Sequence, residues 1–187
     1  MSCHDFESAA RERSFPLDAE PPDETFDETD TLARWLERRL DETTDWLLDE
    51  ARLYGLTVND PAALLAERPG AARFCLLDRG YPYDVLDGPA SLLAANFDAV
   101  GLVNLGWSAP LEDRGSIIER PSRHPARRRV RIVTVARIDP SPRHSIVATA
   151  IRDRATGEVT SVRGGEGRIV EGICRLAAES LAMRLAA

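Results

Sequence analysis

The sequence predicts an α+β protein with a helical N-terminal half, an antiparallel β-meander of about four strands and a C-terminal helix packed on the sheet. Apolar residues recur at helical spacing up to about residue 54, whereas short β-branched runs between turn formers follow residue 97. The 187 residues fit one domain, which we expect over 29–187, after an acidic flexible arm over 1–28.

Three helices account for the predicted helical part, residues 29–96. The first spans 30–54, begins at Thr29 or Asp30 as N-cap and is closed by Gly55. A second begins with Asp60 as N-cap and runs until Pro69-Gly70 breaks it, and a third spans 88–96. The secondary structure of residues 71–77 is ambiguous from the sequence. The first helix has an apolar stripe at three- to four-residue spacing: Leu32, Leu36, Leu40, Thr43, Leu47, Ala51 and Tyr54.

The predicted sheet and final helix occupy residues 97–187. Strands are expected over 97–106, 130–138, 145–152 and 158–162. The last three are joined by connections too short for a crossover helix, so they should form an antiparallel meander. A helix over 167–183 has one apolar stripe, and we expect this stripe to pack on one face of the sheet.

Charge is unevenly distributed along the chain, which has a formal net charge of −7. Residues 1–60 carry 17 acidic residues and 6 arginines, whereas residues 111–187 carry 9 and 15. All 24 basic residues are arginine, so lysine chemistry such as a Schiff base or a P-loop is excluded. Either the acidic half partly neutralises the basic half, within one molecule or across a dimer, or the basic half binds an anion.

Compartment and membrane association follow from what the sequence lacks. No apolar run approaches the ~20 residues that a spanning helix needs, and the first 20 residues do not resemble a signal peptide. Cys3, Cys75 and Cys174 are odd in number and lie far apart, which fits neither a disulfide scaffold nor a zinc finger. We therefore expect a cytoplasmic protein without a membrane partner, metal or cofactor.

The most unusual segment follows the first predicted strand, where six arginines and a histidine lie within residues 120–131. Guanidinium groups bind phosphate and carboxylate in a bidentate fork, which makes the segment a candidate anion-binding site. The alternative is a solvated strand face beside a charged loop. The candidate residues are Trp107, Arg120, Arg123, His124, Arg127, Arg128, Arg129 and Arg131.

Two functions are compatible with these residues. The first is a noncatalytic binding or accessory protein whose arginine-rich loop engages an anionic ligand or an acidic protein surface. The second is a small enzyme acting on a phosphorylated or nucleotide substrate, with His124 as acid or base. Nucleic acid is disfavoured by the net charge of −7 and by the lack of interleaved aromatic residues. Homo-oligomerisation is left open.

One stretch carries a resemblance. The run Gly106-Trp107-Ser108-Ala109-Pro110-Leu111, followed by Arg120-Pro121-Ser122-Arg123-His124-Pro125 and Arg127-Arg128-Arg129-Val130, is similar to a pattern in a family of small actinobacterial proteins. The resemblance covers about residues 97–138 and implies a bacterial, cytoplasmic origin. That family has no assigned activity, so the resemblance transfers no catalytic residue.

Overall fold

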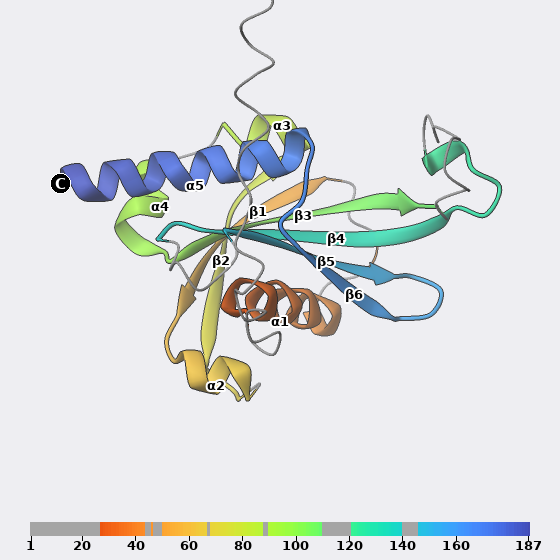
Figure 1. Ribbon diagram of the computed structural model, residues 1–187, viewed down its shortest axis with the longest axis horizontal. Helices are drawn as coiled ribbons and strands as arrows, with labels where there is room; N and C mark the ends of the chain where they lie inside the picture. Colours follow the sequence, from red (N-terminus) through yellow and green to blue (C-terminus); the bar gives the residue numbers. More distant parts are fainter. Residues whose placement is uncertain are drawn as a thin grey trace, which may run out of the picture.

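The fold is a six-stranded antiparallel sheet with helices on both faces (Figure 1). The computed structural model describes residues 27–43, 46, 50–66, 68–87, 90–109, 121–139 and 146–187. The strand order is β2-β1-β3-β4-β5-β6. The elements are α1 Glu28–Thr43, β1 Ala51–Val58, α2 Pro61–Leu65, β2 Ala72–Gly80, α3 Pro82–Val85, α4 Ala90–Asn96, β3 Ala99–Ser108, the 3-10 turn η1 Pro121–Arg123, β4 Arg128–Arg137, β5 Val147–Asp153, β6 Val159–Arg163 and α5 Arg168–Ala186.

The predicted helical first half is wrong, because two of the six strands, β1 and β2, lie within it. The first helix ends at Thr43, and Ala51 and Tyr54, assigned above to its stripe, belong to β1. Both faces of β1 are covered, so Leu53 and Tyr54 are both buried although they point to opposite sides. A strand buried on both faces shows no alternation, and its apolar spacing resembles that of a helix.

Gly55 contributed to the same error. It lies within β1 instead of closing a helix, and the ring of Phe97 packs directly over it. A Cβ at this position would lie 2.6 Å from Cγ of Phe97. The glycine is therefore required by a close ring contact, which a reading of local sequence cannot distinguish from a helix end.

The predicted second half agrees with the structure more closely. The strands expected over 97–106, 130–138, 145–152 and 158–162 correspond to β3, β4, β5 and β6, with bounds that differ by one to two residues. The final helix extends to Ala186 and packs on the sheet. The α+β class is confirmed, whereas the count of about four strands is not.

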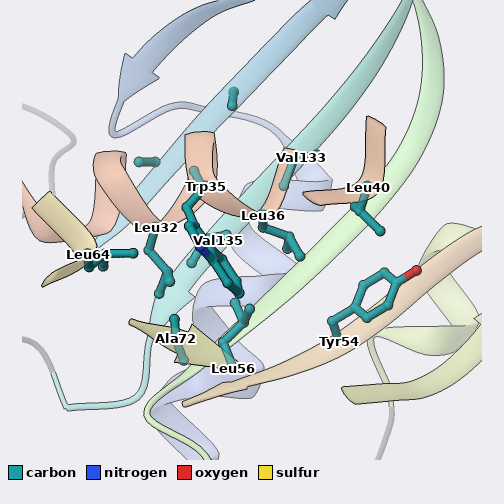
Figure 2. Close-up of a cluster of buried hydrophobic side chains, with 14 of the residues drawn as sticks. Leu32, Trp35, Leu36, Leu40, Tyr54, Leu56, Leu64, Ala72, Val133 and Val135 are labelled. Carbon is teal, nitrogen blue, oxygen red and sulfur yellow. The ribbon is translucent and has the colours of Figure 1, made fainter. Parts of the chain in front are cut away.

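Helix α1 forms the core on one face of the sheet (Figure 2). Leu32, Leu36 and Leu40 are almost completely buried against the central strands, so the first part of the predicted stripe is a genuine core face. Trp35 extends this core toward the sheet edge, where its ring meets Phe74 of β2 edge to face at 5.9 Å.

Helices α3, α4 and α5 form a second core on the opposite face. Ile173 and Leu176 of α5 are completely buried in a cluster with Leu102 of β3 and Ala136 of β4. Arg184 near the end of α5 donates hydrogen bonds to backbone carbonyls of the α4 region, including Phe97 O. These bonds join the last turns of α5 to the chain entering β3.

Side-chain caps begin the first two helices. Asp60 accepts hydrogen bonds from the N–H groups of Ala62 and Ala63 at 2.9 and 3.1 Å, as the sequence predicts for α2. The cap of α1 is Asp27, which accepts from the N–H of Thr29 at 2.9 Å, and not Thr29 or Asp30. Residues 1–26 of the predicted acidic arm lie outside the described residues.

Strands β3 and β4 extend beyond their neighbour β1. Strand β1 pairs with β3 only as far as Arg52 opposite Val103, whereas β3 pairs with β4 to Ser108 opposite Arg128. The β3–β4 pair therefore projects from the body of the sheet (Figure 1). Among the helices that the structure describes, none is long and apolar enough to cross a membrane.

Candidate functional site

The predicted site residues that the structure describes lie around the projecting β3–β4 pair, but their surroundings differ. Arg120 lies outside the described ranges. Arg123 is exposed in η1, and His124 follows it half-buried. Trp107 lies near the end of β3, directly opposite Arg129 of β4.

Trp107 is contacted by two arginines. The guanidinium carbons of Arg127 and Arg129 are each 5.1 Å from the centre of the Trp107 ring, a cation–π distance. The ring itself is 39% exposed. Within the described part of the chain, neither arginine forms an ion pair with a carboxylate. We call these three side chains the Arg-Trp-Arg surface.

Arg128 has a different role from its two neighbours. Successive side chains of a strand point to opposite faces, so Arg128 lies on the face opposite to Arg129. Its Nη1 is 3.3 Å from Oδ2 of Asp153, at the end of β5. The Asp153 carboxylate also accepts the N–H of Ala155 at 2.7 Å. Arg128 therefore already has an anionic partner within the protein.

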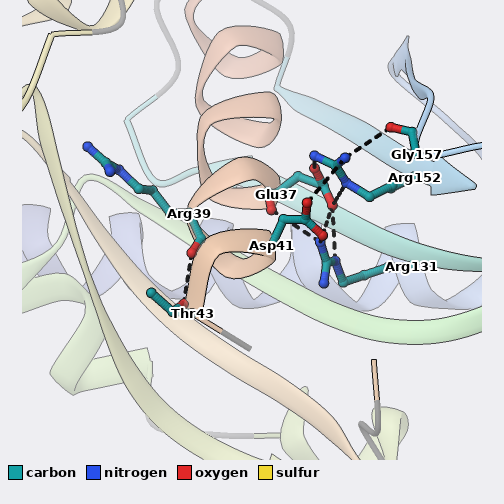
Figure 3. A network of polar contacts seen from close by, with 7 residues as sticks. All are labelled: Glu37, Arg39, Asp41, Thr43, Arg131, Arg152 and Gly157. Carbon is teal, nitrogen blue, oxygen red and sulfur yellow. Dashed lines mark hydrogen bonds and ion pairs between the residues drawn. The ribbon is translucent and has the colours of Figure 1, made fainter. Parts of the chain in front are cut away.

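Arg131 is part of the core rather than of a binding surface (Figure 3). Its side chain is completely buried, and its Nε donates to Oε1 of Glu37 on α1 at 3.0 Å. Its Nη2 also lies 2.8 Å from Oδ1 of Asp41. Arg152 of β5 joins the group through its Nε, which donates to the same Glu37 oxygen at 2.7 Å. This hydrogen bond raises the pKa of Arg152 above its ordinary value.

The extent of α1 explains why Arg129 and Arg131 differ. The two residues are two positions apart on β4 and share the face toward α1. Helix α1 covers Arg131 with Glu37 and Asp41, whereas Arg129 beyond it is covered by Trp107. The sequence of the arginine run does not show which arginine is buried. The carboxylates that pair with Arg131 lie about 90 residues away in the chain.

A cleft of about 430 Å³ adjoins the Arg-Trp-Arg surface, where β1 begins and β2 ends. The amide oxygen of Asn104 is buried there and has no hydrogen-bond partner among the described residues. Tyr81, which is 61% exposed, forms part of the wall. The lining residues are Glu50, Ala51, Gly80, Tyr81, Pro82, Asn104, Leu105 and Arg129.

The sequence did not indicate this cleft. Its members come from four separate strands, from the start of α3 and from the residues next to them, and only Arg129 was among the predicted site residues. The local signal in the sequence is the aromatic pair that flanks Pro82, of which Tyr81 is exposed. Register determines the cleft, since it forms only because β3 is longer than its neighbour on one side.

His124 does not line this cleft. Its Nδ1 accepts the N–H of Ala126 at 3.0 Å, a local contact within the turn that leads into β4. Over the described ranges, no group of three or more His, Cys, Asp or Glu side chains is arranged to hold a metal ion. Comparison with family models, with curated proteins and with solved structures gives no match for this chain.

Proposed function

We propose that this protein is a noncatalytic binding protein that engages an anionic group of a partner through Arg127, Trp107 and Arg129. The observation that carries the proposal is that two guanidinium groups lie against one exposed indole ring without a carboxylate partner among the described residues. Burial of Arg131 and pairing of Arg128 remove those two from the candidates.

The ring supports the proposal by arranging the arginines. A guanidinium stacked on an aromatic face keeps its N–H donors directed outward in its plane, so it can still form a bidentate contact with phosphate or carboxylate. Two such groups held against one ring have restricted conformational freedom. Less conformational entropy is then lost when an anion binds.

The alternative of an enzyme using His124 receives less support. His124 makes a local turn contact and does not line the cleft beside Arg129. A general acid or base has to reach its substrate within hydrogen-bond distance. We also propose a cytoplasmic location, because Cys75 and Cys174 are both free thiols, which fits a reducing compartment.

Binding of tripolyphosphate, measured by calorimetry and by thermal unfolding, tests the proposed function. At 100 times its dissociation constant the ligand should stabilise the protein by ~2.7 kcal/mol, and the affinity should fall as salt is added. The double variant R127A/R129A should lose at least a tenfold factor in affinity. Its unfolding free energy should change by only ~1–2 kcal/mol, since each exposed cation–π contact contributes ~0.5–1 kcal/mol.

A matched control separates a specific site from overall charge. Arg68 and Arg73 are exposed near α2 and β2, so R68A/R73A removes the same charge from another surface. This variant should bind tripolyphosphate with the affinity of the wild type. Equal weakening in both double variants would reduce the effect to net charge and contradict the proposal.

A further inference from the structure

Beside the Arg-Trp-Arg surface, one edge of strand β3 has no strand partner among the described residues. Residues 104–108 of β3 pair with β4 on one side, while the ladder with β1 ends at Val103. On the β1 side, no described strand continues along these five residues. An edge of this kind presents backbone N–H and C=O groups that can pair with another chain.

The ladder shows which backbone groups face outward. In an antiparallel sheet, the N–H and C=O of one residue point to the same neighbour, and successive residues alternate between neighbours. Arg137 N donates to Ile146 O at 3.0 Å and Arg154 N donates to Arg129 O at 2.9 Å, so odd-numbered residues of β4 point toward β5. The even-numbered residues of β4, and the even-numbered residues of β3 that lie opposite them, therefore point toward each other. Leu105 and Trp107 therefore direct their N–H and C=O groups away from β4, toward the unpaired side.

The cleft lies along this same edge. Ala51 is the first residue of β1 and Gly80 the last of β2, and Asn104 and Leu105 belong to the part of β3 that continues past them. The buried Asn104 oxygen needs a hydrogen-bond donor, which the N–H groups of a peptide would supply. The cleft thus has the position, and one polar group, that an added strand would use.

We propose that the partner is an extended acidic peptide segment, which adds to the sheet as a strand along Leu105–Trp107. This inference rests on the proposed function. Main-chain hydrogen bonds to an exposed sheet edge provide affinity, and side chains alternate between two faces to provide specificity. A peptide residue beside Trp107 that shares its face would direct its side chain toward Arg127 and Arg129.

Charge complementarity identifies the occupant as acidic and positions its acids. Arg127 and Arg129 stack on Trp107, at one end of the edge, whereas Glu50 lines the other end of the cleft. An acidic side chain is therefore favoured beside Trp107 and disfavoured beside Glu50. Tyr81, exposed on the cleft wall, offers an apolar contact to the segment near Glu50.

The probe is a labelled octapeptide in which glutamate alternates with valine, acetylated and amidated at its ends. Its binding to the full chain is measured by fluorescence anisotropy. Two further peptides serve as controls: one with glutamine for glutamate, and one N-methylated at its four central amides. Each control should bind at least tenfold more weakly, since the first removes the charges and the second removes the main-chain donors.

Amide hydrogen exchange measured by NMR gives a second readout that identifies the edge. On saturation with the acidic peptide, the amides of Leu105 and Trp107 should exchange at least tenfold more slowly. The amides of Gly106 and Ser108, which already face β4, should change far less. This alternation is specific to strand addition and would not result from an anion binding to the arginines alone.

The outcomes distinguish this inference from the proposed function. If the N-methylated peptide binds as tightly as the unmodified one and R127A/R129A weakens both, strand addition is refuted while anion binding stands. If neither the peptides nor tripolyphosphate binds, both proposals fail. Protection of Leu105 and Trp107 in the absence of peptide would also overturn the inference, because the edge would already be occupied by this chain or by a second copy.

Discussion

Arg131 of β4 and Glu37 of α1 form an ion pair in which both side chains are completely shielded from solvent. The pair joins the first helix to the centre of the sheet, and Arg152 and Asp41 extend it to four charges. Removing one member of a buried pair leaves the other charge without compensation, which costs far more than replacing both by apolar groups.

Replacement of Glu37 by Leu should therefore destabilise the protein by ~3–5 kcal/mol in urea unfolding, because two arginines then share only Asp41. The double variant E37L/R131M should lose less than E37L alone, since the buried cation is removed as well. A double variant less stable than E37L would show that Arg131 contributes chiefly through contacts other than this ion pair, such as its stacking on Trp46.

Leu40 tests the core beneath α1. Its side chain is 2% exposed, so Leu40→Ala should lower the unfolding free energy by ~2–5 kcal/mol through lost burial and the cavity left behind. Leu65, on α2, is 47% exposed and serves as the matched control. Equal effects of the two substitutions would contradict the assignment of Leu40 to the core.

Gly55 and Phe97 should behave as a coupled pair. A methyl group at Gly55 would overlap the Phe97 ring, so Gly55→Ala should cost ~1–3 kcal/mol. In a Phe97→Ala background the same substitution should be close to neutral. Gly80→Ala is the control, because its Cβ would meet only Val85 at an ordinary contact distance of 3.6 Å.

Asp153 should make the unfolding free energy depend on pH in the acidic range. Its pKa is lowered, chiefly because the N–H of Ala155 donates to the carboxylate, with further contributions from Thr156 and Arg128. A folded-state pKa below the unfolded value of about 3.9 gives stability that is present above that value and lost as pH falls through the folded pKa. The stability difference between wild type and Asp153→Asn should thus shrink on acidification.

Carbon-13 NMR of the carboxyl group measures the midpoint directly, and the Asp153→Asn variant identifies the resonance. A midpoint at or above about 3.9 would contradict the expected direction. So would a stability difference between the two proteins that stays constant from pH 5 to pH 2.

The second half of the fold was predictable because its local signals agree. The β-branched runs of β4 and β5 are bounded by turn formers, and the stripe of α5 has a single period. In the first half the signals conflict. Leu53 and Tyr54 are buried on opposite faces, and Gly55 is explained by Phe97, which lies about 40 residues away.

The candidate site was predictable only in composition. The sequence shows that arginines gather beside Trp107, but it treats Arg127, Arg128, Arg129 and Arg131 alike. Their separation depends on distant partners, namely Asp153 for Arg128 and Glu37 for Arg131. The cleft at Asn104 depends on the residue at which the pairing of β1 with β3 begins, which no local sequence pattern indicates.

The long sequence separation of the Glu37 contacts has a consequence during synthesis. Glu37 meets Arg131 after 94 further residues and Arg152 after 115, so α1 emerges from the ribosome long before the strands that cover it. Until β5 is made, the nascent chain carries an amphipathic acidic helix, and the sheet on which its apolar stripe packs is incomplete. The growing chain is therefore most exposed to aggregation or to capture by a chaperone after α1 has been synthesised and before β5 has.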